Sequence, residues 1–473
     1  MYKERTKVFK DSNQTNPIIT HRYGADPYAM EYQGRVYVYM TNDILEYKDG
    51  EMIENTYQKI NTINCVSSAD MVNWTDHGSL KVAGSEGAAK WAKNSWAPAA
   101  AHKKINEQDK FFLYFADSGK GIGVVTSDTP IGPWIDPIDG PIASTKTANC
   151  ADVLWCFDPA VWVDDDNRAF LYFGGGVPEG KGAMPNTARA VELGEDMISL
   201  KGTPVMIEAP YLFEDSGINK IGDTYYYSYC SNFDERNDPS AKIVLETGQI
   251  NYMTSKNPLG PFVYQKPILK NPGSFFGGWG NNHHCFIKFK GDYYMFWHTQ
   301  TLRIKQELPA KGYRCTHVDK MTVNEDGTIE SIEASYTGVS QLQPLNPYQV
   351  NRTDTFAWTA GIDTIPSKDD SRVMCLTGID TGDYIGISGV EFTSEGASAI
   401  SVMTASVTDG CAINIYLDSM EKEAVATIQV PNTLDLEKFT KTMIPLDRMI
   451  GNHNVFFVFE GKDFAFDSWQ FSR

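Results

Sequence analysis

The chain has 473 residues, of which 42% are hydrophobic, and a formal net charge of -18 at pH 7. Chains of this length usually fold into more than one domain. The negative charge argues against nucleic acid and anionic membrane surfaces as partners, and no apolar run approaches the roughly 20 residues that a transmembrane helix needs.

The first residues and the cysteines bear on the compartment. The chain opens with MYKERTKVFKDSNQTNP, which lacks the apolar core of a signal peptide. This predicts a cytoplasmic protein, or a secreted one whose signal peptide is not included in the sequence. The eight cysteines show no short paired spacing of a zinc or redox motif, so we expect buried free thiols rather than a disulfide framework.

A hairpin-like repeat runs through the first 340 residues. Each copy has a small or polar opening, a short strand, a turn rich in Gly, Asp or Asn, and a second apolar strand, which is typical of a β-hairpin. Five copies recur at intervals of roughly 55 to 70 residues. They are DPYAMEYQGRVYVYMTND from Asp26, APAAAHKKINEQDKFFLYFADS from Ala97, DPAVWVDDDNRAFLYFGGG from Asp158, EDSGINKIGDTYYYSYCSN from Glu214 and HHCFIKFKGDYYMFWHT from His283.

This repeat predicts a five-bladed β-propeller over residues 1–340, with a β-sandwich of coincidentally similar hairpins as the alternative. The innermost strand of each propeller blade runs along the central axis, so equivalent positions at the strand starts converge on one mouth. Asp26, Asp158 and Glu214 occupy such positions. The sequence therefore predicts three carboxylates facing one another across a funnel.

The remainder of the chain reads as a second β domain. Residues 341–349 contain two prolines and no clear periodicity, which favours a linker. Residues 350–473 read as short alternating strands, which predict an antiparallel β-sandwich of the jelly-roll type. The whole chain is expected to be all-β.

Three converging carboxylates suit the hydrolysis of a glycosidic bond. That reaction needs an acid to protonate the leaving oxygen and a carboxylate to act on the anomeric carbon or on water. A third carboxylate can keep the acid protonated, because like charges resist simultaneous ionisation. Asp158 alone fits a turn or cap residue equally well, but three acids at equivalent positions favour a site.

The motifs of the first domain resemble glycoside hydrolase family 43, of the arabinoxylan arabinofuranohydrolase type. The resemblance implies a five-bladed propeller and an inverting mechanism. It also implies that Asp26 is the general base, Asp158 the residue that modulates the pKa of the acid and orients it, and Glu214 the general acid. The motifs that carry it are NPIITHRYGADPYA, NSWAPA, CFDPAVWVDDD, EDSGINKIGDTYYYSY, GNNHHCFIKFKGDYYMFWH and GYRCTHVDKMTVNEDGTI.

Glu208 is a competing candidate for the acid, because Glu208-Ala209-Pro210 is similar to the EGP of many family members. Counting back from Tyr225 favours Glu214, since Glu208 would require six additional residues compared with Glu214. We therefore expect Glu214 to be the acid.

Three further residues are candidates for substrate contact. The resemblance implies that Arg314 contacts the substrate near the acids, where a guanidinium can also hold a carboxylate ionised; a surface salt bridge is the alternative. Trp96 fits an apolar wall against the sugar or a core position. The resemblance points to His283 and calcium, which prefers oxygen ligands, so we expect a water bridge rather than a direct bond. The alternative is that His283 and His284 are hydrogen-bonded in a loop.

The second domain resembles carbohydrate-binding module family 6, a β-sandwich that holds xylan or related chains and often contains a structural calcium. The resemblance rests on TDTFAWTAGI, DYIGISGVEF, INIYLDSMEKEAVATIQV and FAFDSWQF. Arg352 and Asp354 stand where members commonly have two glutamates, which argues against that calcium site. Asp467 is a candidate calcium ligand or a strand-edge aspartate. Trp358 and Trp469 are candidate stacking platforms or core residues.

Together these features predict a glycosidase that releases α-L-arabinofuranosyl side chains from arabinoxylan, a plant cell-wall polysaccharide, with no cofactor for the chemistry and a possible structural calcium. An exo-acting β-xylosidase is the enzymatic alternative. A carbohydrate-binding protein without catalysis belongs to a different functional class, and the intact acid set argues against it. A protein-binding scaffold is a third class, which predicts no affinity for sugars.

Overall fold

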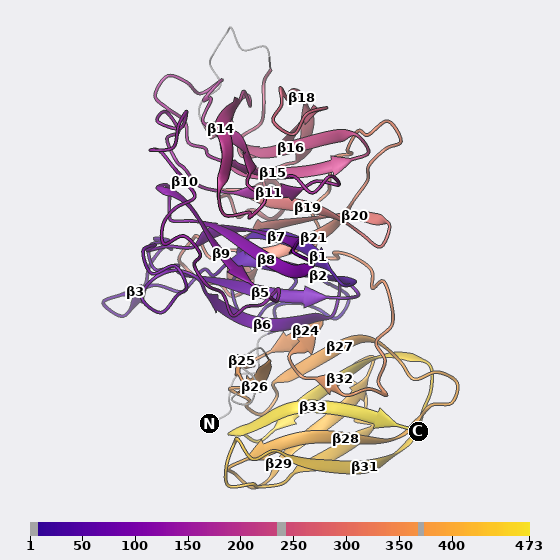
Figure 1. The fold of residues 1–473 in the computed structure, drawn as a ribbon. Helices are drawn as coiled ribbons and strands as arrows, with labels where there is room; N and C mark the ends of the chain where they lie inside the picture. Colours follow the sequence, from indigo (N-terminus) through magenta and orange to yellow (C-terminus); the bar gives the residue numbers. More distant parts are fainter. Residues whose placement is uncertain (1–7, 234–242, 368–372) are drawn as a thin grey trace.

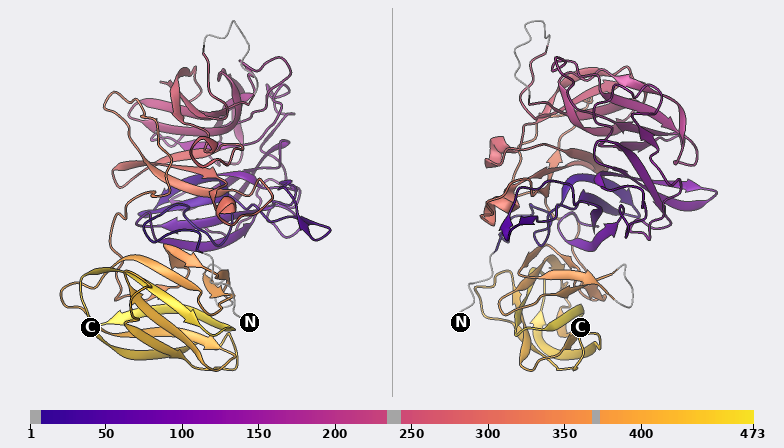
Figure 2. Two further views of the ribbon diagram at one scale, coloured as in Figure 1. Left: turned by 180° about the vertical axis from the view of Figure 1, so that it is seen from behind. Right: turned by 90° about the vertical axis from the view of Figure 1, so that its left-hand side faces the viewer.

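The computed structural model describes residues 8–233, 243–367 and 373–473, and almost all of its regular structure is β (Figure 1). Two one-turn helices, α1 (Gly273–Phe276) and α2 (Thr301–Lys305), lie on the same side of the first domain (Figure 2). No helix within these ranges is long and apolar enough to cross a membrane. The all-β prediction is confirmed.

The first domain is the predicted five-bladed propeller. Its innermost strands contact one another in a closed ring in the order β1, β7, β11, β15, β19 and back to β1. The copies of the repeat therefore correspond to the inner hairpins of the blades. Blade 1 contains β1 (Ala25–Tyr32), β2 (Arg35–Thr41), β5 (Thr62–Ser68) and β6 (Trp74–Lys81), with a small hairpin of β3 (Tyr47–Lys48) and β4 (Glu51–Met52) beside it.

The other blades follow in chain order. Blade 2 contains β7 (Trp96–Ile105), β8 (Gln108–Ala116), β9 (Gly121–Ser127) and β10 (Ala143–Ser144). Blade 3 contains β11 (Ala160–Val163), β12 (Ala169–Phe173), β13 (Ala188–Leu193) and β14 (Leu200–Ile207). Blade 4 contains β15 (Leu212–Ile221), β16 (Thr224–Ser231), β17 (Ile250–Ser255) and β18 (Val263–Leu269). Blade 5 contains β19 (His284–Phe289), β20 (Asp292–Thr299) and β21 (Cys315–Met321).

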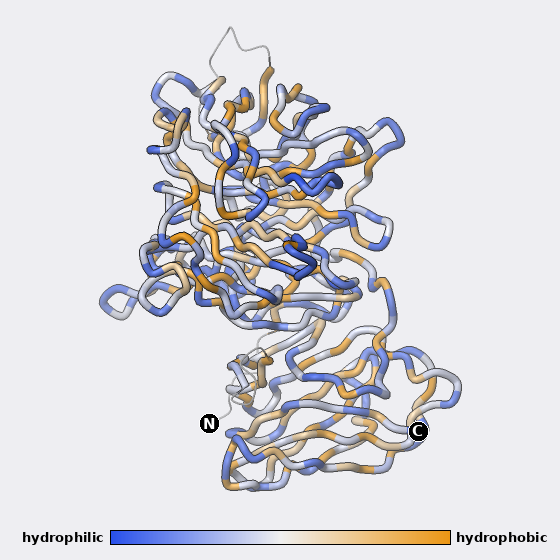
Figure 3. Tube along the Cα trace, in the orientation of Figure 1, coloured by the Kyte–Doolittle hydropathy of each residue, from blue (hydrophilic) through white to orange (hydrophobic). Residues whose placement is uncertain are grey.

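The middle strands of the blades are apolar on both faces. The run AFLYF of β12 is buried throughout, and so are the last six residues of β8, FFLYFA. A strand that is covered on both faces reads as a continuous hydrophobic run rather than as an alternation. Figure 3 shows this pattern as hydrophobic segments inside the domain and hydrophilic turns at its surface.

The N-terminal segment closes the ring against blade 5. Ile18 N–H donates to Thr316 O at 2.9 Å, and the Asn16 side chain accepts from Val318 N–H and donates to Val318 O. Residues that are about 300 positions apart in sequence are thereby joined. All eight cysteines are buried and free, as predicted.

The second domain is the predicted β-sandwich. One sheet has the order β25-β26-β33-β28-β31, with β22 beside β33, and the other has the order β24-β27-β32-β29-β30. The first sheet contains β22 (Asn351–Arg352), β25 (Asp363–Pro366), β26 (Met374–Thr377), β28 (Ala397–Ser406), β31 (Thr440–Met449) and β33 (Phe464–Ser472). The second contains β24 (Trp358–Ala360), β27 (Tyr384–Glu391), β29 (Cys411–Leu417), β30 (Ala426–Val430) and β32 (Asn452–Glu460).

The two domains share an interface. Strand β23 (Thr355–Phe356) pairs with β6 and extends the sheet of blade 1. The segment 341–349, which we predicted as a linker, is held on both sides, because Gln341 donates to Asp70 of the propeller and to the Ser388 carbonyl of the sandwich. Trp358 is buried here and donates through its indole N–H to Gln14 O at 2.9 Å. In Figure 1 the sandwich accordingly lies directly beside blade 1.

Candidate active site

The backbone at the start of the inner strands directs side chains toward the axis. Asp26, Ala97 and Asp158 all have positive φ, at 47°, 41° and 50°, and each precedes a proline. The strand register also shifts at the start of β1 and β7 and around Glu214 in β15. Such bulges and left-handed residues re-aim side chains and are common beside functional sites. The first residue of the repeat therefore has the same unusual conformation in three blades.

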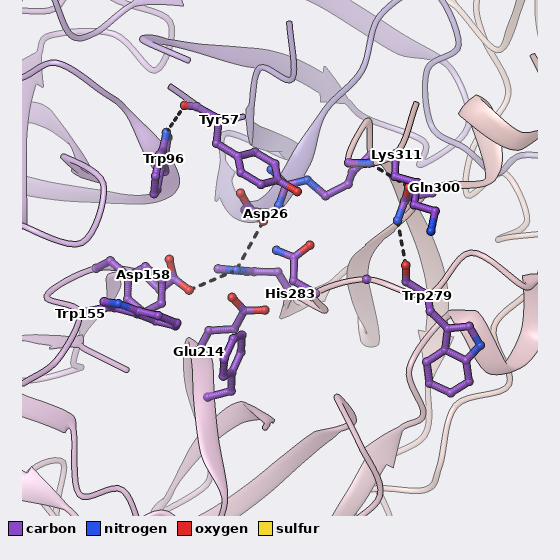
Figure 4. Close-up of a pocket in the computed structure, with 16 residues that line it drawn as sticks. Asp26, Tyr57, Trp96, Trp155, Asp158, Glu214, Trp279, His283, Gln300 and Lys311 are labelled. Carbon is purple, nitrogen blue, oxygen red and sulfur yellow. Dashed lines mark hydrogen bonds and ion pairs between the residues drawn. The ribbon is translucent and has the colours of Figure 1, made fainter. Parts of the chain in front are cut away.

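Asp26, Asp158 and Glu214 line one cavity of about 340 Å³. Asp26, Asp158 and Glu214 surround His283 in Figure 4, with Trp96 on one wall. All six candidate residues of the first domain lie in this cavity, whose complete lining is Asp26, Tyr57, Trp96, Trp155, Phe157, Asp158, Phe213, Glu214, Trp279, Gly280, Asn281, His283, Gln300, Lys311, Gly312 and Arg314. Glu208, by contrast, is exposed and outside it.

Asp26 is held in its ionised form. Arg314 Nη1 donates to Asp26 Oδ1 at 2.8 Å, and His298 Nδ1 lies 3.1 Å from the same oxygen. Burial alone would raise the pKa of Asp26, but the charge of Arg314 and the hydrogen bond with His298 outweigh it and bring the pKa far below its usual range. Arg314 is itself buried, so it is not a surface salt bridge.

Asp43 fixes the guanidinium of Arg314. Its carboxylate accepts from Arg314 Nε at 2.9 Å, from Nη2 at 2.8 Å and from the Arg314 backbone N–H at 2.8 Å. The ring of Tyr57 lies over the guanidinium, 4.9 Å from its central carbon. Arg314 is thereby clamped between two carboxylates and one aromatic face.

Glu214 has the opposite electrostatic environment. Burial raises its pKa well above the usual value, and the neighbouring charges of Asp158 and Asp26 raise it further. Burial and the charge of Asp26 also raise the pKa of Asp158, whose Oδ2 accepts the Asp215 backbone N–H at 3.0 Å. Glu214 Oε1 is buried and has no hydrogen-bond partner within the described part of the chain. A protonated carboxyl group with an unpaired oxygen thus faces an ionised carboxylate in one pocket.

Asp215 organises the histidine pair at the floor of the pocket. Its carboxylate accepts from His284 Nδ1 at 2.5 Å and lies 3.2 Å from His283 Nε2. His283 Nδ1 in turn lies 3.6 Å from Asp26 Oδ1 and 3.7 Å from Asp158 Oδ2. Burial lowers the pKa of His283, so the imidazole is a neutral group between three aspartates.

The aromatic residues form the walls and rim. Trp96 donates through Nε1 to Tyr57 O at 2.9 Å, which fixes its ring beside the cavity. Trp155 and Phe213 meet edge to face, with ring centroids 5.3 Å apart. Trp279 is 55% exposed at the rim. Flat apolar faces beside polar groups suit a sugar, whose rings have apolar faces and polar edges.

The structure contradicts one of the two expected calcium sites, the one at Asp467. Asp467, a candidate calcium ligand, is instead the ion-pair partner of Arg352, whose Nη2 lies 2.7 Å from Asp467 Oδ1. The guanidinium supplies the positive charge that a cation would otherwise provide. Trp358 and Trp469 are both buried, so neither is a stacking platform.

The second expected calcium site, at His283, has no set of side chains among the described residues that would coordinate the ion directly. Within residues 8–233, 243–367 and 373–473, no three His, Cys, Asp or Glu side chains are arranged to hold a metal ion. Both His283 nitrogens face aspartate carboxylates, and calcium prefers oxygen ligands. The donor set does not fit direct coordination by His283, and a water-mediated contact stays a prediction.

Carboxyl groups with opposite pKa shifts in the axial pocket of a propeller are the arrangement that a glycosidase needs, and the comparisons with known proteins place the chain in that class. Residues 14–329 match Glycosyl hydrolases family 43, and residues 353–473 match Carbohydrate binding module (family 6). The chain belongs to glycosyl hydrolase family 43.

Two relatives are similar over nearly the whole of this chain. The arabinoxylan arabinofuranohydrolase of Bacillus subtilis is 45% identical, covering 99% of this chain and 94% of that protein. The enzyme of the same name from Paenibacillus polymyxa is 44% identical, covering 98% of this chain and 75% of that protein.

The solved structures show the same likeness. The Bacillus subtilis arabinoxylan arabinofuranohydrolase, in complex with cellotetraose, matches with a TM-score of 0.94 over 99% of both chains. A β-xylosidase/α-arabinofuranosidase from a compost metagenome, described in a calcium-free form with xylotriose, is 28% identical with a TM-score of 0.52, over 69% of this chain and 98% of that chain.

Three residues that support the acids and Arg314 were not predicted from the sequence: Asp43, Tyr57 and Asp215. Asp43 and Asp215 are not at the repeat's first polar position, and Tyr57 lies in the loop between two strands of blade 1. Asp215 directly follows Glu214, and this adjacency was the one available signal. Nothing in the local sequence marks Asp43, because its partner Arg314 lies 271 residues away.

Proposed function

We propose that the protein releases α-L-arabinofuranosyl side chains from arabinoxylan by inverting hydrolysis. The observation that carries this proposal is the pairing, in one pocket, of an Asp26 held ionised by Arg314 with a Glu214 kept protonated by burial and neighbouring carboxylates. The substrate class is supported by the similarity of the whole chain to two arabinoxylan arabinofuranohydrolases.

In the proposed reaction Asp26 is the general base. Its ionised carboxylate accepts a proton from a water molecule as the water oxygen attacks the anomeric carbon. The guanidinium of Arg314 keeps Asp26 charged and fixes one of its oxygens, so that the other can approach the water. This arrangement keeps the base ionised across the neutral pH range.

Glu214 is the general acid in this proposal. Its proton passes to the glycosidic oxygen as the bond to the anomeric carbon breaks, which releases the polysaccharide as a neutral alcohol. Asp158 raises the pKa of Glu214 through its nearby charge and is anchored by the Asp215 backbone. Trp96 and Arg314 border the space in which the sugar would lie.

We assign no catalytic step to calcium. A calcium ion near His283 would be held through water and would be structural. Chelation should then lower the melting temperature without abolishing turnover at a temperature where the protein stays folded. A complete loss of turnover at unchanged folding would contradict this assignment.

Product analysis tests the proposed function. Arabinoxylan is incubated with the wild-type protein and with Glu214→Ala, and the released monosaccharides are separated by chromatography. Arabinose from the wild type and almost none from the variant supports the substrate and the acid together. Xylose as the main product would move the assignment to a β-xylosidase, and no sugar from the wild type would favour a non-catalytic carbohydrate-binding protein.

A further inference from the structure

A second cavity lies between the two domains. This interdomain groove has a volume of about 600 Å³ and is lined by Arg35, Asn73 and His77 of blade 1, by residues 343–346 and 349–352, and by Asp354 and Trp469 of the sandwich. It shares no lining residue with the catalytic pocket. Its size falls within the roughly 300–1,000 Å³ of small-molecule sites.

Two buried N–H groups in the groove have no acceptor. Trp469 is 1% exposed, and its indole Nε1 has no hydrogen-bond partner among the residues that the structure describes. The same holds for Nε of Arg352, on the strand that pairs with β33. Indole and guanidinium groups donate but do not accept hydrogen bonds. The missing partner of both is therefore an acceptor, such as the oxygen of a hydroxyl group or a sugar ring.

Amide side chains supply the complementary chemistry. The groove contains Asn73, Gln343, Asn346, Gln349 and Asn351. An amide offers a donor and an acceptor on one planar group, which matches a hydroxyl group that also does both. Gln349 is exposed, and within the described ranges its side chain forms no hydrogen bond, so it is available to a ligand.

The charges in the groove are nearly balanced. Two arginines, Arg35 and Arg352, and two aspartates, Asp70 and Asp354, line it. Arg352 is also paired with Asp467. Burial lowers the pKa of His77 to about 4, so this imidazole is neutral at pH 7. An anionic ligand needs unpaired cations, and the groove offers no surplus of them. A neutral ligand is favoured over an acidic sugar or a phosphate.

We propose that the interdomain groove is a second glycan site, which binds a neutral, hydroxyl-rich oligosaccharide. Because the proposed function makes arabinoxylan the substrate, the assignment of the ligand as an unsubstituted stretch of the xylan main chain rests on that function. Binding of the main chain between the domains would hold the polymer on the protein while side chains are removed at the catalytic pocket.

The test measures binding of xylotetraose by calorimetry to full-length protein carrying Glu214→Gln. Two sites are expected in this protein. Gln349→Trp, which places a large side chain in the groove, should leave one site, whereas Gln108→Trp, at the exposed first residue of β8, should leave two. Trp469→Phe, which removes the indole N–H but keeps an aromatic ring in the sandwich core, should weaken the second site by about fivefold, as expected for one neutral hydrogen bond.

Several outcomes would overturn the proposal. These are a single site in the parent protein, two unchanged sites in Gln349→Trp, and tighter binding of a uronic-acid oligosaccharide than of xylotetraose. Arabinose release from an aryl arabinofuranoside by Gln349→Trp on the wild-type background should equal that of the wild type. If the wild-type protein releases no arabinose, the proposed function is contradicted. If the groove binds xylotetraose in that case, the glycan site is still supported.

Discussion

The general acid is tested by varying the leaving group of the substrate. Glu214→Gln keeps the shape of the side chain and removes its transferable proton. General acid catalysis contributes about 10²- to 10⁴-fold, which corresponds to about 2.7 to 5.4 kcal/mol of transition-state stabilisation. Glu214 is buried and its pKa lies well above the usual value, so the wild-type side chain holds the proton that the Glu214→Gln side chain cannot transfer. We therefore expect a loss in the upper part of this range on arabinoxylan.

The loss should be much smaller on a nitrophenyl arabinofuranoside. A nitrophenolate leaves without protonation, so the value of kcat/KM should fall by no more than about tenfold. Asp26→Asn, which removes the base, should lower kcat/KM on both substrates. Steady-state kinetics on the two substrates, with circular dichroism to confirm folding, separates the two roles.

Glu208→Gln is the matched control, because Glu208 is exposed and lies outside the pocket. Its kinetics should equal those of the wild type on both substrates. Glu214 is not the acid if Glu214→Gln loses the same factor on both substrates, or if Glu208→Gln shows the dependence on the leaving group instead.

Three other perturbations have defined outcomes. Arg314→Gln removes the cation that lowers the pKa of Asp26, so the acid limb of the kcat/KM–pH profile should move to higher pH. If the acid limb does not move, the guanidinium does not have this role. Asp215→Asn weakens the hydrogen bonds of the carboxylate to the histidine pair and should lower kcat by about 10- to 100-fold, with a smaller change in KM. A rise in KM of that size at constant kcat would instead indicate a role in substrate binding. Trp358→Ala, at the buried domain interface, should cost about 3 to 5 kcal/mol in denaturant unfolding, whereas Trp279→Ala at the exposed rim should stay within about 0.5 kcal/mol.

The propeller could be predicted because its repeat is local. Each blade begins with a hairpin whose turn, strand length and apolar run are encoded within about 20 residues, and the five copies are visible without knowledge of contacts. The repeat also identified Asp26, Asp158 and Glu214, since equivalent positions in a closed ring of strands must converge. The cavity lining agrees with this deduction.

The protonation states could not be predicted in the same way. Arg314 lies 288 residues from Asp26 and 271 from Asp43, and only folding brings the three together. The difference between an ionised Asp26 and a protonated Glu214 comes from that arrangement. Both carboxyl groups are buried, but Asp26 is paired directly with Arg314, whereas around Glu214 burial and the neighbouring carboxylates outweigh that cation.

In the second domain, too, the fold could be predicted from the sequence and the long-range contacts could not. Its alternating strands were sufficient to predict a sandwich, because a sheet with one buried face leaves a period of two in the sequence. The sequence does not show that Trp358 is buried against the propeller or that Arg352 neutralises Asp467, since both depend on which surfaces meet. The sequence by itself therefore determined the two folds and the set of acids, through periodicity and repetition. The tertiary structure decided the charges of those acids, the domain interface and the groove within it, because each arises from contacts between residues that are far apart in the chain.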